Sequence, residues 1–134
     1  MTTSEREGLN KAALFTKTVI QREIEAVAPG RRMRGVGLRG ARVGAGYKVG
    51  PHTAIVQARG PLHLLERGTK PHEITNRKRR KKKGMTTPYG VRKRVMHPGT
   101  RGKYPWRKGV AKAGPLVPKV FKQGFYEPIE RIFR

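Results

Sequence analysis

The sequence of 134 residues contains no cysteine and no aspartate. Without cysteine, neither a disulfide scaffold nor a thiolate metal site can form. No apolar run approaches the ~20 residues that cross a bilayer. The N-terminus carries two glutamates and no continuous apolar stretch, so it does not have the pattern of a signal peptide. We therefore expect a soluble, intracellular protein with no membrane partner.

Residues suited to catalysis are also scarce. Glu66 and Glu73 are the only acids between residues 31 and 126, and we expect Glu66 to form an ion pair at a strand end. The sequence Gly35–Gly40 has the glycine spacing of a phosphate loop but no preceding strand and no GK[ST]. The histidines lack the short spacing of metal ligands; they are His52, His63, His72 and His97. We predict no enzyme, no cofactor and no metal site.

Positive charge is abundant and concentrated. The chain has 32 Lys and Arg against 8 Glu, a net charge of +24. Residues 1–30 and 127–134 are each neutral, so the entire net charge lies in residues 31–126. A field of this strength attracts polyanions and repels its own copies. We expect an acidic macromolecule, nucleic acid or protein, to lie against this region.

The first segment has the pattern of an amphipathic helix over residues 4–28. Ser4 and Glu7 have the spacing of a capping box, and Pro29-Gly30 ends the pattern. The apolar stripe at helical spacing consists of Leu9, Ala12, Ala13, Thr16, Val19, Ile20, Ile24 and Val27. Because this helix is charge-balanced, we expect its stripe to face a core or a subunit, not a membrane.

The middle of the chain favours short strands joined by basic loops. Residues 30–51 contain seven glycines and favour a flexible basic arm or an irregular strand pair. Residues 53–75 are interpreted as a compact antiparallel meander, with turns at Gly60-Pro61 and at residues 68–71. Residues 91–96 are expected to pair back as a further strand.

Seven consecutive bases interrupt the strand-like region within the loop 77–84. Such a run repels itself, so ordering it requires nearby negative charge. The run is Arg77, Lys78, Arg79, Arg80, Lys81, Lys82 and Lys83.

The C-terminal segment is expected to be a broken helix. Pro105 suits a first helical turn, Gly114-Pro115 breaks the helix, and Pro128 is expected to kink or interrupt the second half. The whole chain is then one α+β domain: an N-terminal amphipathic helix, a small antiparallel sheet with long basic loops, and a broken C-terminal helix.

Two strings of the sequence are residues 58–72, ARGPLHLLERGTKPH, and residues 97–106, HPGTRGKYPW. Together they resemble the neck or tail-completion family of head–tail connector proteins from siphophages of actinobacteria. In that family a strand delivers an E-x-G-T turn, a basic loop follows, and a C-terminal helix closes the sheet. The matching strand and turn here would be Leu64, Leu65, Glu66, Gly68 and Thr69.

This resemblance implies a structural virion protein at the head–tail joint, synthesised in the cytoplasm of the host cell. Its implied partners are copies of itself in a ring, usually a hexamer, and other connector proteins: a stopper or adaptor, a tail terminator or a tail tube. Packaged DNA in the channel is a further possible partner. We expect residues 77–83 to reach a neighbouring subunit or this DNA. Candidate subunit or partner contacts are Tyr104, Trp106, Phe121 and Phe125.

Two other classes remain open. A ribosomal or other RNA-packing protein would share the basic composition, the absence of cysteine and the glycine-rich arm. Basic residues interleaved with Tyr47, Tyr89, Tyr104 and Trp106 could also stack on single-stranded bases, although core or interface positions are favoured. A DNA-binding regulator is less favoured, since only one clear helix precedes the expected sheet.

Overall fold

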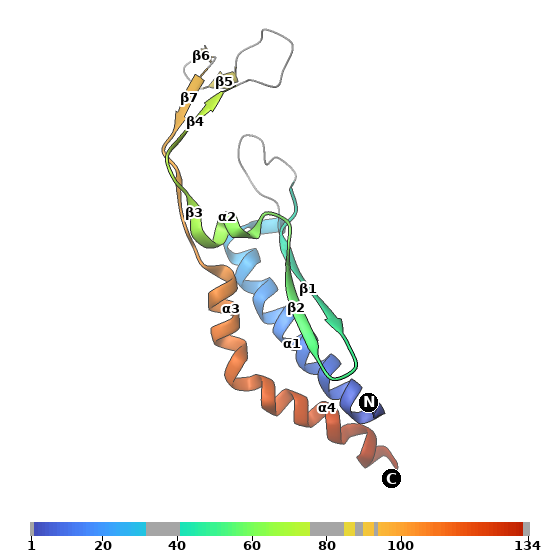
Figure 1. Cartoon of the computed structure of the whole chain (residues 1–134). Coiled ribbons are helices and arrows are strands. Elements are labelled where there is room, and N and C mark those ends of the chain that lie inside the picture. Colours follow the sequence, from blue (N-terminus) through green and yellow to red (C-terminus); the bar gives the residue numbers. More distant parts are fainter. Residues whose placement is uncertain (1, 32–40, 76–84, 88–89, 93, 133–134) are drawn as a thin grey trace.

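A computed structural model of the chain describes residues 2–31, 41–75, 85–87, 90–92 and 94–132. It confirms an α+β fold with long helices at both ends of the chain and short antiparallel strand pairs between them. The helices and one β-hairpin form a body, and a two-stranded ribbon projects from one end of it (Figure 1). The N- and C-terminal ends lie together at the opposite end of the body.

The first helix, α1 (Thr3–Val27), confirms the expected amphipathic helix and differs at its cap. The capping box is formed by Thr2 and Glu5, not by Ser4 and Glu7. The Thr2 backbone N–H donates to the Glu5 carboxylate at 2.8 Å, and the Glu5 N–H donates to Thr2 Oγ1 at 3.2 Å. The spacing S/T-x-x-E occurs in both pairs of residues, so spacing alone did not choose between them. At the other end lies a 3₁₀ turn, η1 (Pro29–Arg31), with Gly30 at φ 68°.

The C-terminal part of the chain packs along α1 as two helices, α3 (Pro105–Ala113) and α4 (Val117–Ile132). The expected start at Pro105 is correct, and the expected break at Gly114 is the 3₁₀ turn η2 (Gly114–Leu116). Of the kink or interruption expected at Pro128, the interruption is wrong, because α4 continues through it to Ile132. Pro128 lies close to the end of α4, where its missing N–H removes a single backbone hydrogen bond.

Glycines let these helices approach one another closely. A Cβ atom added to Gly109 of α3 would lie 2.7 Å from the Ile20 Cα atom of α1. A Cβ atom added to Gly124 of α4 would lie 3.0 Å from the Gly8 Cα atom. Larger side chains at these positions would force the helices apart.

The glycine-rich segment supplies the first strand. Strand β1 (Gly44–Val49) pairs antiparallel with β2 (Ala54–Arg59), from Gly44↔Arg59 to Val49↔Ala54. Residues 44–49 thus form one strand of a regular pair whose partner lies beyond the segment, rather than a flexible arm or an irregular pair, and residues 32–40 lie outside the described residues. The Ala45 N–H donates to Gln21 Oε1 at 3.0 Å, which fixes β1 against α1.

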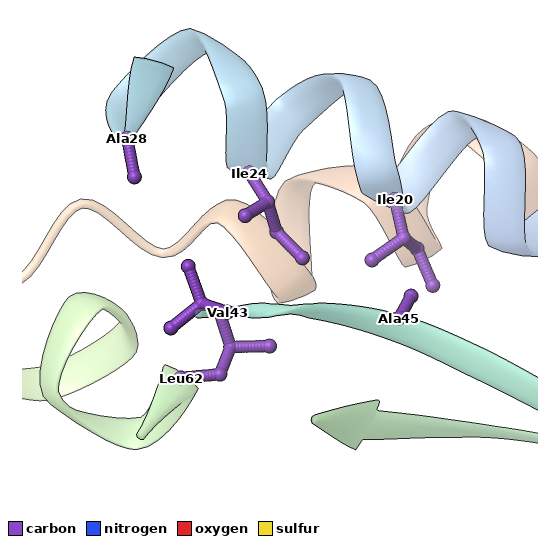
Figure 2. Close-up of a cluster of buried hydrophobic side chains, with 6 residues drawn as sticks. All are labelled: Ile20, Ile24, Ala28, Val43, Ala45 and Leu62. Atoms are coloured by element: carbon purple, nitrogen blue, oxygen red, sulfur yellow. The ribbon is translucent and has the colours of Figure 1, made fainter. Parts of the chain in front are cut away.

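The core lies between α1, β1 and a short helix, α2 (Leu62–Arg67). In Figure 2, Ile20, Ile24 and Ala28 point toward Val43, Ala45 and Leu62. Ile20 and Ile24 are fully buried. Burying such side chains contributes about 1.5–3 kcal/mol each, and the core remains small.

The expected meander over residues 53–75 is wrong in its second part. Residues 62–67 form α2, not a strand, and β2 does not pair with the strands after it in the chain. A short apolar run such as Leu62-His63-Leu64-Leu65 fits both the period of a helix and the period of a strand. A helix places Leu62 and Leu65 against the core, and the end of α2 at Gly68 has φ 75°.

After α2 the chain forms the ribbon, of which the structure describes residues 68–75, 85–87, 90–92 and 94–101. Strand β3 (Gly68–Thr69) pairs with β8 (Thr100–Arg101), and β4 (His72–Thr75) pairs with β7 (Arg94–His97). One register runs through both pairs, from Gly68↔Arg101 to Thr75↔Arg94. Strands β5 (Met85–Thr87) and β6 (Gly90–Arg92) form a further antiparallel pair. The expected strand over residues 91–96 is therefore divided between β6 and β7.

Candidate functional site: the joint and the basic ribbon

The two strings that carry the family resemblance lie against each other in the structure. Residues 62–69 and 99–106 form what we call the joint, where the ribbon meets the body (Figure 1). The Lys103 N–H donates to the Leu65 carbonyl oxygen at 2.9 Å, and the hydroxyl oxygens of Thr69 and Thr100 lie 3.1 Å apart. No pattern in the sequence indicated that these strings are neighbours.

Glu66 connects α2 to the first turn of α3. Its Oε2 atom accepts the Trp106 N–H at 2.9 Å, and its Oε1 atom accepts the Arg107 N–H at 3.2 Å. A carboxylate at this place satisfies two backbone donors without a partner in the helix and complements the positive end of the helix dipole. The expected ion pair of Glu66 at a strand end is thus replaced by a cap on another element.

Glycines at the joint allow backbone to touch backbone. A Cβ atom added to Gly68 would lie 2.0 Å from the Thr100 carbonyl oxygen, and one added to Gly102 would lie 2.5 Å from the Glu66 carbonyl oxygen. Gly99 has φ 85°, and its added Cβ atom would lie 2.4 Å from the Thr69 carbonyl oxygen. The glycines of both strings are therefore needed for the closeness of the ribbon's two strands at its base.

Two histidines stack across the ribbon just beyond the joint. His72 and His97 are paired in register, and their ring centroids lie 5.2 Å apart. The His72 Nδ1 atom lies 2.8 Å from the Lys70 carbonyl oxygen, whereas the His97 Nδ1 atom accepts the Gly99 N–H at 3.0 Å. Within the described ranges, no three His or Glu side chains are grouped as metal ligands.

The four aromatic candidates take different positions. Trp106 is half-buried and packs against the core, and the Phe121 ring covers Gly8 at the crossing of α1 and α4. Phe125 is also half-buried, with its ring centroid 6.0 Å from that of Phe121. Tyr104 alone is exposed; it has the left-handed backbone angle φ 53°, and the Arg107 guanidinium lies 5.1 Å from its ring centroid.

Most of the acidic side chains pair with other groups of the same chain. Glu23 accepts from Lys112 Nζ at 2.5 Å, Glu73 lies 3.5 Å from the Arg94 guanidinium, and Glu127 pairs with Lys11. The Thr2 backbone N–H lowers the pKa of Glu5, and the Lys11 hydrogen bond lowers the pKa of Glu127. With Glu66 at the joint and Glu25, which accepts from Gln21, at least six of the eight glutamates have intramolecular partners.

The ribbon carries bases that are exposed to solvent. The exposed bases in its described part are Lys70, Arg92, Arg94 and Arg101. The run Arg77 to Lys83 lies outside the described residues, between β4 and β5 in the sequence.

No described helix is both long enough and apolar enough to cross a membrane. Comparison of the chain with protein-family models, with curated proteins and with solved structures finds no significant match.

Proposed function

We propose that this chain is a structural subunit of a siphophage head–tail connector, forming a ring that joins the DNA-filled head to the tail. The observation that carries the proposal is the joint. The two strings that resemble the neck or tail-completion family are separated in sequence, yet they lie against each other and fix the ribbon to the body. A motif shared with a family is more informative when its parts form one structural unit.

The shape of the chain suits a subunit that reaches its neighbours. The eight residues from Gly68 to Thr75 extend about 26 Å at ~3.3 Å per residue. An isolated two-stranded ribbon is only marginally stable in water. A surface of a neighbouring subunit, a partner ring or DNA would cover it in an assembled connector.

The body offers apolar side chains for contacts between subunits. Each is more than two-fifths exposed in the single chain; they are Leu14, Ile55, Val110, Leu116 and Tyr126. Contacts through these residues would be apolar and would therefore survive high salt. Because each copy carries +24, self-repulsion opposes ring closure at low salt, and high salt screens that repulsion.

Native mass spectrometry of the recombinant protein, after nuclease treatment and a ~1 M salt wash, tests the ring. A closed oligomer, in particular a hexamer, is the expected result. In virions, replacing the seven bases at 77–83 by Gln and Ser should reduce the joining of heads to tails. Wild-type yields of joined particles would refute a role of the run in assembly.

A ribosomal-type RNA-binding protein is the second candidate, favoured by one observation: a basic ribbon that projects from a small body. Such an extension is expected of a chain packed into folded RNA. In the same experiment this candidate predicts a monomer after the salt wash that reassociates only when RNA is added. Binding should then weaken steeply with salt.

A further inference from the structure

The ribbon surface has the character of a polyanion-binding surface. Its described bases project from a strand pair that has no third strand beside it among the described residues. Residues 68–101 contain twelve Lys or Arg and a single acid, Glu73, which is already 3.5 Å from Arg94. The ribbon therefore has almost no negative charge of its own to offset its bases.

A second copy of the chain cannot supply the missing negative charge. Each copy brings 8 glutamates, at least six of them engaged internally, against 32 bases. Adding copies therefore increases the excess of positive charge. The compensating charge must come from a different, strongly acidic molecule.

Exposed apolar side chains, typical of a protein interface, are few where the structure describes the side chains of the ribbon. Among those residues, Met96 is the one large apolar side chain that is exposed. Protein interfaces have an apolar, often aromatic centre from which charged residues are depleted. Phosphate-binding surfaces need no such centre, because release of counterions drives their binding.

The width of a two-stranded ribbon suits the major groove of B-form DNA better than that of A-form RNA. The major groove of B-form DNA, about 12 Å wide, admits a two-stranded β-ribbon. The corresponding groove of A-form RNA is too deep and narrow for side chains to enter. We propose that the ribbon lies in the major groove of double-stranded DNA and binds the phosphates beside it, without sequence preference, through Lys70, Arg92, Arg94 and Arg101. This deepens the proposed function, on which it rests, by naming the partner of the ribbon.

The test compares two variants of equal charge. The ribbon variant carries Lys70→Gln, Arg92→Gln, Arg94→Gln and Arg101→Gln. The control variant carries Arg22→Gln, Lys108→Gln, Lys119→Gln and Lys122→Gln, which remove four exposed bases from α1, α3 and α4. Fluorescence anisotropy with a 30-base-pair DNA of random sequence, at several salt concentrations, gives the affinity and its salt slope. Circular dichroism verifies that both variants fold.

We expect the ribbon variant to lower the slope of log affinity against log salt by about 3–4 units, because each phosphate contact contributes ~0.9. The control variant should lower it by less than about 1 unit. Equal effects of the two variants would overturn the proposal, as would equally tight binding to duplex RNA of the same sequence or to polyglutamate. The oligomer measurement is separate: DNA binding by a chain that forms no ring would support this inference and refute the connector ring.

Discussion

At the residue scale, individual side chains and close backbone contacts hold the ribbon to the body. Glu66 accepts hydrogen bonds from two backbone N–H groups of α3, and Gly68 leaves room for the Thr100 carbonyl oxygen. Both residues belong to the E-x-G-T string that carries the family resemblance. The strand and turn that the resemblance implied here are wrong, because Leu64, Leu65 and Glu66 lie in α2 and Gly68 begins β3. The acid of the string caps a distant helix, and its glycine allows two strands to meet.

Replacing Glu66 by Ala should destabilise the protein by about 1–2 kcal/mol, since the first turn of α3 loses its cap and a favourable charge. Urea unfolding followed by circular dichroism measures the change. Glu130→Ala is the control, because Glu130 is an exposed glutamate in the last turns of α4. An equal loss in both variants would show that Glu66 does not act as a cap.

Gly68 and Gly30 form a matched pair for a second prediction. Their φ angles are similar, 75° and 68°, but a Cβ atom at Gly68 would lie 2.0 Å from a carbonyl oxygen, whereas one at Gly30 meets nothing within 4 Å. Gly30→Ala should cost about 1–2 kcal/mol from backbone strain alone. Gly68→Ala should cost clearly more, as measured by thermal unfolding. Similar losses of stability in the two variants would show that the strands of the joint lie farther apart than in the structure.

At the element scale, close contacts between helices define the body. Gly109→Ala places a Cβ atom 2.7 Å from the Ile20 Cα atom and should cost about 1–3 kcal/mol by overpacking. Gly114→Ala is the control, since its Cβ atom meets nothing within 4 Å and its backbone is already helical. This control should be neutral or stabilise by up to about 1 kcal/mol. Chemical denaturation measures the stability of both variants. If Gly109→Ala were also neutral, the close packing of α3 against α1 would be contradicted.

The contact between α1 and α4 should depend on pH. Lys11 lowers the pKa of Glu127 below the ordinary value of 4.5. The contribution of this pair is therefore fully present above about pH 4.5 and is lost as the pH falls through the lowered pKa. The stability difference between the native chain and Glu127→Gln should vanish at low pH, as urea unfolding between about pH 3 and 7 would measure. A constant difference across that range would show that the pair contributes nothing.

The elements differ in how well the sequence predicted them. Periodicity and local stop signals predicted α1, α3 and the break at Gly114, because these depend on neighbours in sequence. Leu62-His63-Leu64-Leu65 was too short to distinguish helix from strand, and core packing made it a helix. The pairing of β3 with β8 and the cap by Glu66 join residues about 30–40 apart, so no local pattern contained them.

At the scale of the whole molecule, a small core is combined with a large excess of positive charge. Nine buried hydrophobic residues make up the described core, whereas the chain as a whole carries +24. Self-repulsion of that size opposes folding of the free chain. Repulsion between exposed charges is screened by salt, with a Debye length of about 10 Å at 0.1 M and about 3 Å at 1 M.

The free protein should therefore become more stable as salt increases. With DNA the sign reverses: a duplex at about 100 times its Kd should stabilise the fold by about 2.7 kcal/mol at low salt, and added salt should remove that gain as it weakens binding. Thermal unfolding from about 0.05 to 0.5 M salt, with and without DNA, measures both trends. The stabilities measured with and without DNA should converge at high salt, where both the repulsion and the binding are screened. A free chain that loses stability as salt rises would show that repulsion among its bases is not what limits its fold.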